Sequence, residues 1–211
     1  IKAMQSGDSR SAVKCIAILV SLFTLVYAYG AYAINKYSAR SAKALEVSLL
    51  QGNIPQEAKW ASTFRAKIKQ IYFNLTRESA KADADLIIWP ETAYPDYFSG
   101  QDRFAFGELM GLSRQVQKPL LFGVVLEEQG KYFNTAAFIP VDLSQVNFYK
   151  KIHLVPFGEY LPLRQYLPFL VKFVPIEDFD AGKELVVFEA KNKQSEPVAF
   201  GVLICFEDTI S

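Results

Sequence analysis

The first apolar segment of the chain is long enough to form a membrane helix. Residues 15–34, CIAILVSLFTLVYAYGAYAI, contain no charged side chain. An α-helix of about twenty residues spans roughly 30 Å, the hydrocarbon thickness of a bilayer. Lys14 and Lys36 flank the segment, where their amines can reach lipid headgroups. The pattern therefore predicts a membrane segment over residues 1–43, with a transmembrane helix at residues 15–34.

Two alternatives to a transmembrane helix stay open. Ala31 and Ala33 could supply the small-residue cleavage site of a secretory signal peptide, although the apolar run exceeds the roughly 7 to 15 residues usual there. The segment could also be a buried helix of a soluble domain. Basic residues flank both ends of the segment, so the charge distribution does not fix its orientation in a membrane.

From residue 44 onward, short apolar runs alternate with helical and turn-rich segments. Helices are predicted over residues 60–75 and from Arg103 to Gln117. The first would be amphipathic, with an apolar face formed by Trp60, Phe64, Ile68, Ile71 and Leu75. Strands are predicted at residues 44–53, 84–91, 119–128, 132–141, 146–155, 185–190 and 198–206. Strands interleaved with helices indicate an α/β layer fold in which some neighbouring strands form hairpins.

Two predicted connections are long, aromatic and rich in proline, at residues 92–100 and 156–175. Loops of this length in a compact domain are usually functional or disordered, and the aromatic content argues against disorder. Their side chains could simply pack beneath the loops as part of the core. Alternatively, apolar loops beside the site of a membrane-tethered domain could accept a lipid chain from the bilayer.

Composition and charge exclude some classes of protein. Apolar residues make up 51% of the 211 positions, which allows a sizeable core. The net charge is +1 with both signs scattered, so we expect no nucleic-acid partner. Cys15 and Cys205 are the two cysteines, too few for a disulfide framework. The chain offers no cluster of Cys and His that would predict a metal site.

Three residues with useful chemistry follow predicted apolar strands: Glu91 in LIIWPE, Lys151 in YKKIH and Cys205 in LICFED. A nearby carboxylate could take the proton of a thiol, and a lysine could stabilise the thiolate and then a tetrahedral oxyanion. A lone cysteine in an apolar strand is nevertheless more often a core residue. Because neighbours in a strand face opposite sides, only one of Lys150 and Lys151 can face such a site.

The sequences around these residues resemble the apolipoprotein N-acyltransferases, a membrane branch of the nitrilase or carbon-nitrogen hydrolase superfamily. The resemblance covers residues 44–211 and rests on the blocks LLQGNIPQEAKW, LIIWPETAYP, YKKIHLVPFGEYLP and GVLICFED. It implies a nitrilase-like αββα sandwich over residues 44–211, preceded by the last transmembrane helix of the family. Because the chain begins at Ile1 and stops six residues after Cys205, we expect an internal segment whose catalytic domain is truncated.

The resemblance also implies a role for each matching residue. Glu91 matches the general base, Lys151 the lysine of the triad and Cys205 the nucleophile. Four further positions match supporting residues: Glu159, expected to orient the lysine, together with Trp60, Phe206 and Glu207. Phe206 replaces a tyrosine common in the family, which puts substrate handling in question but leaves the backbone N–H of residue 206 available as an oxyanion donor.

The implied reaction transfers an acyl chain from a membrane phospholipid to an apolipoprotein. Cys205 would form a thioester, which the N-terminal amine of diacylglyceryl-cysteine would then attack. The reaction needs no cofactor and no metal. The family places this domain on the periplasmic side of the bacterial inner membrane. We expect residues 1–211 alone to have little activity and to leave a sheet edge exposed.

Three other functions stay open. A nitrilase-type amidase would hydrolyse a C–N bond through the same Glu-Lys-Cys triad, with water as the acceptor. A cysteine protease would pair Cys205 with His153, the only histidine. A membrane-anchored interaction domain would need none of these residues. Substitution of Lys151 by alanine would abolish thioester formation in the acyltransferase, whereas in a protease substitution of His153 would do so and that of Lys151 would have little effect.

Overall fold

The computed structural model of the 211-residue chain describes residues 5–37, 44–55, 59, 62–99, 103–143, 145–162 and 178–210. The chain divides into two compact units, Ile1–Ala42 and Lys43–Ser211. Each unit has its own architecture.

The first unit contains the helix α1 (Gln5–Tyr37), which is 33 residues long. Its stretch Ser11–Lys36 has 26 residues and a mean hydropathy of 2.0, sufficient in length and composition to cross a bilayer. Within this unit the side chains of that stretch are exposed, apart from half-buried positions at Gly30 and Ala33. The helix predicted at residues 15–34 is confirmed and extends beyond both predicted ends.

The second unit is built on a mixed sheet with strand order β1-β2-β4-β5-β6. Its strands are β1 (Val47–Leu49), β2 (Leu86–Ile88), β4 (Leu120–Glu128), β5 (Lys131–Ile139) and β6 (Asn147–Lys150). The first three pair in parallel, whereas β4, β5 and β6 pair antiparallel. A smaller sheet consists of the antiparallel pair β7 (Phe188–Lys191) and β8 (Pro197–Phe200). The predicted combination of α/β layers and hairpins is therefore confirmed.

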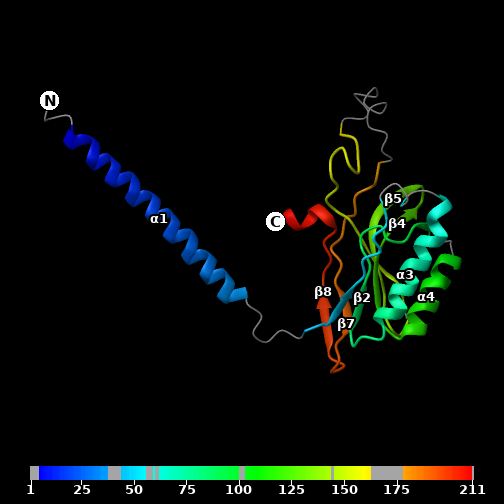
Figure 1. The fold of residues 1–211 in the computed structure, drawn as a ribbon. Coiled ribbons are helices and arrows are strands. Elements are labelled where there is room, and N and C mark those ends of the chain that lie inside the picture. The colour runs from blue at the N-terminus through cyan, green and yellow to red at the C-terminus, as the bar shows by residue number, and fades with distance from the viewer. Residues whose placement is uncertain are drawn as a thin grey trace. The chain divides into compact units, whose positions relative to one another are not determined.

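The two faces of the large sheet are covered differently, as Figure 1 shows. The helices α3 (Arg65–Ser79) and α4 (Arg103–Val116) lie over one face, and the β7–β8 hairpin lies over the other. Each face has its own hydrophobic cluster. Trp89, Phe98 and Leu109 belong to the cluster on the helical side. Phe138 and Phe188 belong to the cluster beneath the hairpin.

The buried face of α3 differs from the predicted one. The chain enters this helix through a short 3-10 turn, η1 (Ser62–Phe64), and the buried residues of α3 are Ile68, Tyr72 and Thr76. Tyr72 stacks on Trp89 with ring centroids 5.0 Å apart, and the Thr76 hydroxyl accepts a hydrogen bond from Trp89 Nε1 at 2.9 Å. The contacts of Tyr72 and Thr76 with Trp89 therefore determine which face of α3 is buried. Trp60 lies outside the described residues.

The connection over residues 92–100 contains a strand that the pattern did not predict. This strand, β3 (Tyr97–Ser99), pairs in parallel with the end of β4. Tyr94 and Phe98 are buried in the core, so packing beneath the loop explains the aromatic content of this connection. Most of the second long connection, at residues 163–175 of 156–175, lies outside the described residues. In its described part Phe157 is exposed and Leu161 is buried.

Candidate active site

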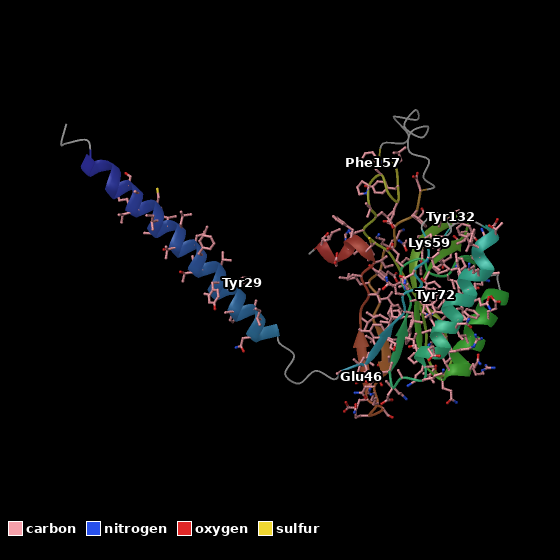
Figure 2. All side chains as sticks on the ribbon, viewed as in Figure 1. Tyr29, Glu46, Lys59, Tyr72, Tyr132 and Phe157 are labelled. Atoms are coloured by element: carbon pink, nitrogen blue, oxygen red, sulfur yellow. The ribbon has the colours of Figure 1, made fainter. Side chains whose placement is uncertain are left out.

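The sheet topology brings the sequence-predicted residues to one end of the second unit. Glu91 follows β2, Lys151 follows β6, and Cys205 follows β8. The opposite end holds Glu46, which precedes β1 and pairs with Lys193 in the β7–β8 turn. Figure 2 shows the same division, with Lys59, Tyr132 and Phe157 towards one end and Glu46 towards the other.

Lys151 forms a buried ion pair with Glu159. Only 1% of Lys151 is exposed, and its Nζ lies 2.9 Å from Oε1 and 2.8 Å from Oε2 of Glu159. The carboxylate is held in turn by the backbone N–H of Val155, which donates to Oε2 at 2.9 Å. A buried ammonium is tolerated only when it is paired and hydrogen-bonded. Glu159 therefore supplies the partner that this buried amine needs and fixes its position.

The neighbouring lysine faces a different set of partners. Lys150 Nζ pairs with Glu128 at 2.5 Å and lies 4.6 Å from the ring centroid of Phe133. As the alternation of an extended strand predicts, adjacent lysines are directed to opposite sides. Lys151 is consequently the lysine that reaches Glu91 and Glu159.

Glu91 reaches the same lysine from the turn after β2. Its Oε1 lies 4.0 Å from Lys151 Nζ, and 36% of its side chain is exposed. The backbone of this turn packs against Gly123 of β4, where an added Cβ would lie 2.3 Å from the backbone nitrogen of Thr92 and 2.5 Å from Glu91 Cα. Gly123 N–H also donates to the Pro90 carbonyl at 3.2 Å. A side chain at position 123 would therefore displace the turn that carries Glu91.

Asn134 in β5 connects the two carboxylates and was not predicted from the sequence. Its Nδ2 donates to Glu91 Oε1 at 2.6 Å and to Glu159 Oε1 at 2.7 Å. The available signal was a polar residue within YFNTAAFI, a strand otherwise buried from Phe133 to Ile139. Buried amides need partners, but the pattern did not indicate which residues those would be.

Glu207 joins the turn that carries Cys205 to the segment that carries Lys151. Its Oε1 accepts the backbone N–H groups of Ile152 at 2.8 Å and His153 at 3.0 Å. Its Oε2 accepts the N–H of Ile204 at 2.8 Å, and the Tyr149 hydroxyl lies within 3.0 Å of both oxygens. Glu207 thus holds the residues on either side of the site by one carboxylate.

These hydrogen bonds decide the ionisation of Glu207. Burial alone would raise the pKa of its carboxyl, but the donors from His153, Ile204, Ile152 and Tyr149 outweigh burial and leave the pKa below its ordinary value. The same contact, together with burial, raises the pKa of the Tyr149 hydroxyl. Glu207 is therefore an anion and Tyr149 a neutral donor at neutral pH.

Cys205 occupies a strained turn rather than the strand predicted over residues 198–206. The strand β8 ends at Phe200, and a 3-10 turn, η3 (Cys205–Thr209), begins at the cysteine itself. Cys205 is exposed and has φ +55°, whereas Ile204 before it is extended with φ −102°. Left-handed non-glycine residues are uncommon and cluster at functional sites. The next residue, Phe206, is also exposed.

A cavity opens beside Glu91. It has a volume of about 320 Å³, and its lining includes Asn53, Lys59 and Glu91. Lys59 Nζ donates to the backbone carbonyl of Glu91 at 3.2 Å; burial lowers the pKa of Lys59, and the charge of Glu91 opposes that shift. An apolar cavity of about 450 Å³ shares Asn53, Ile54 and Ile68 with the first one. Among the described residues, no three His, Cys, Asp or Glu side chains are grouped as metal ligands.

The comparison with protein families accounts for this arrangement. Residues 46–210 match the family model of the carbon-nitrogen hydrolases. The chain belongs to the carbon-nitrogen hydrolase family. The prediction of a nitrilase-like fold is thereby confirmed, because the mixed sheet and its layers are those of a carbon-nitrogen hydrolase domain.

Solved structures and curated relatives agree with the carbon-nitrogen hydrolase assignment. A carbon-nitrogen hydrolase superfamily protein from Xanthomonas campestris matches with a TM-score of 0.57 at 20% identity, over 79% of this chain and 55% of that one. The chain is 34% identical over 201 residues to the apolipoprotein N-acyltransferase of Geobacter metallireducens, covering 92% of this chain and 37% of that protein. It is 39% identical over 142 residues to the Methylococcus capsulatus enzyme of the same name, covering 65% and 27%. The chain therefore spans about a third of the length of these relatives.

Proposed function

We propose that this chain carries the catalytic domain of an apolipoprotein N-acyltransferase. The observation that carries the proposal is the joining of three strand exits: Lys151 is paired with Glu159 and lies near Glu91, while Glu207 ties the Cys205 turn to the residues after Lys151. The names of the relatives from Geobacter and Methylococcus support the choice of reaction. The helix α1 supports a location in a membrane.

In the first step the Cys205 sulfur attacks an ester carbonyl of a membrane phospholipid. Glu91 takes the thiol proton, and the ammonium of Lys151 stabilises the negative charge that develops on sulfur and on the carbonyl oxygen. The ester C–O bond then breaks, and Glu91 returns the proton to the leaving alkoxide. The products are a lysophospholipid and an acyl thioester on Cys205.

In the second step the N-terminal amine of a diacylglyceryl-cysteine attacks the thioester carbonyl. Glu91 removes a proton from the amine, and the C–S bond breaks as the amide forms. Lys151 stabilises the departing thiolate, which regains its proton from Glu91. Glu159 acts through Lys151, whose charge it compensates. We place the domain on the periplasmic side of a bacterial inner membrane, where mature lipoproteins are assembled.

The proposal is tested by intact mass after a full-length protein containing this chain is incubated with phospholipid vesicles. We expect an acyl adduct that disappears in Cys205→Ala and in Lys151→Ala. Cys15→Ala and Lys150→Ala are the matched controls and should retain the adduct. An adduct that forms without Cys205, or no adduct in the parent protein, would overturn the proposal.

A second incubation separates acyl transfer from hydrolysis, the activity of a nitrilase-type amidase. The acylated protein is mixed with a diacylglyceryl-cysteinyl peptide or with buffer alone. An acyltransferase loses its adduct rapidly to the peptide and slowly to water. Equal loss in both mixtures would favour the hydrolase instead.

A further inference from the structure

Asn134 contacts both carboxylates of the site through one atom. The side chain is buried, with 3% of the residue exposed, and its Nδ2 lies 2.6 Å from Glu91 Oε1 and 2.7 Å from Glu159 Oε1. An amide nitrogen carries two hydrogens, so each carboxylate receives one. Asn134 is therefore a bidentate donor placed between Glu91 and Glu159.

The orientation of this amide is set by the two glutamates. Among the residues that the structure describes, the buried Oδ1 of Asn134 has no hydrogen-bond partner. The reversed amide would place that oxygen against two carboxylate oxygens, which repel it. The contacts with Glu91 and Glu159 thus outweigh the loss of a partner for Oδ1.

The same residue also fixes the lysine of the site. The backbone carbonyl of Asn134 accepts the N–H of Lys151 at 2.8 Å. One residue of β5 therefore positions Glu91 and Glu159 by its side chain and Lys151 by its main chain. Its neighbour Thr135 pairs with Lys150 in the strand register, so these contacts continue the β5–β6 ladder.

The charges around Glu91 explain why it needs this donor. Lys151 lies within 2.9 Å of both oxygens of Glu159 but 4.0 Å from Glu91, so its charge is compensated mainly by Glu159. Lys59 Nζ donates to the backbone carbonyl of Glu91 at 3.2 Å. Two carboxylates that approach one atom repel each other, and such a pair tends to retain a proton.

We propose that Asn134 is a positioning residue that directs the carboxylate of Glu91 as the base of the reaction. It does so by donating one hydrogen to each carboxylate, which holds Glu91 and Glu159 apart in fixed positions. This inference rests on the proposed function, since it assumes that Glu91 acts as a base towards Cys205. Loss of the donor shifts the pH at which the base becomes active, besides lowering the rate.

The test measures the rate of Cys205 acylation against pH in a full-length protein containing this chain. A p-nitrophenyl ester is used as the acyl donor because it requires no recognition of a lipid. Asn134→Leu keeps the size of the side chain but removes both donors, and Asn134→Ser retains one. We expect the acid limb of the profile to move up by about one pH unit or more in Asn134→Leu, with a smaller upward shift in Asn134→Ser.

Asn192→Leu is the matched control, because Asn192 is a buried asparagine whose hydrogen bonds lie within the β7–β8 turn. It should leave the midpoint of the acid limb unchanged. An upward shift confined to the Asn134 variants supports the inference. A lower rate with an unchanged midpoint, or an equal shift in Asn192→Leu, overturns it; if Asn134→Leu does not fold, Asn134→Ser decides alone.

The two proposals can fail separately in this design. If phospholipid leaves no adduct on the parent protein while the ester does, the acyl donor of the proposed function is wrong. The inference about Asn134 would still stand if its variants shift the profile with the ester. Conversely, if phospholipid acylates the parent protein normally but the pH profiles of the Asn134 variants are not shifted, only the inference about Asn134 is overturned.

Discussion

The Tyr149 hydroxyl lies 2.9 Å from one carboxylate oxygen of Glu207 and 3.0 Å from the other. Tyr149 belongs to β6 in the large sheet, and Glu207 follows the hairpin that covers that sheet. Since Glu207 also accepts the N–H groups of Ile152 and Ile204, the two sheets are joined next to the candidate nucleophile. Geometry at Cys205 therefore depends on a carboxylate that need not touch a substrate.

Glu207→Gln should destabilise the domain and abolish acylation. The amide nitrogen would face backbone N–H donors that now point at a carboxylate, so at least one buried donor loses its partner. We expect a loss of about 3 kcal/mol in the free energy of unfolding, measured by urea denaturation. Asp208→Asn changes the exposed neighbouring carboxylate and should have little effect. Wild-type stability in Glu207→Gln would show that the network contributes nothing.

The pH dependence of stability should contain a contribution from Glu207. Its folded pKa lies below the ordinary value of 4.5, so the folded state binds fewer protons than the unfolded state. This stabilisation is fully present above pH 4.5 and is lost as the pH falls through the lower folded value. The free energy of unfolding should therefore rise less steeply with pH in Glu207→Gln than in the parent protein between about pH 3 and pH 6. Parallel curves for the two proteins would argue against this assignment.

Gly123→Ala should impair the site through the backbone of the Glu91 turn. The added Cβ would meet the Thr92 nitrogen at 2.3 Å and the Pro90 carbonyl oxygen at 2.5 Å, and backbone cannot move aside as a side chain can. We expect a cost of about 1 to 3 kcal/mol in stability and a larger proportional loss of acylation. Gly111→Ala in α4 meets no atom within 4 Å and should stabilise the helix slightly. Both variants can be compared by thermal unfolding and adduct formation. Equal stability and equal acylation of Gly123→Ala and Gly111→Ala would contradict the expectation.

Glu159→Gln should reduce acylation by affecting Lys151. The substitution removes the charge that compensates a buried ammonium at 2.8 Å, so Lys151 loses the contact that fixes its position. We expect the rate of adduct formation to fall about a hundredfold and stability to fall by about 3 kcal/mol. Glu189→Gln, on an exposed position of β7, is the matched control. A normal rate of adduct formation in Glu159→Gln would show that the Glu159 carboxylate is not needed for acylation.

The apolar pattern placed Glu91 and Lys151 after predicted strands, and the resemblance of the surrounding motifs to the carbon-nitrogen hydrolase superfamily singled them out. Parallel strands in an α/β layer end on the same side of the sheet, which brings such residues together. The central part of α1 was equally accessible, since no charge interrupts residues 15–34. The hydrophobic pattern thus predicted the apolar helix, the α/β layers and the positions of the candidate residues after strands.

Polar contacts inside the core could not be predicted in the same way. Thr76 is buried because Trp89 Nε1 needs an acceptor, and Asn134 because two carboxylates need donors. These choices depend on which elements meet, information that apolar periodicity does not contain. The turn at Cys205 was missed for a related reason: residues 201–204 are apolar like a buried strand but belong to no strand, because β8 ends at Phe200.

The contacts that assemble this site join positions far apart in the chain. Asn134 lies 43 residues from Glu91, and Glu207 lies 58 residues from Tyr149 and 55 from Ile152. Contacts of such separation close large loops and form late in folding. During synthesis the base and the lysine emerge before the thiol, and the thiol is fixed beside them only after the β7–β8 hairpin docks. We therefore expect the thiol to become reactive only once this hairpin lies against the large sheet.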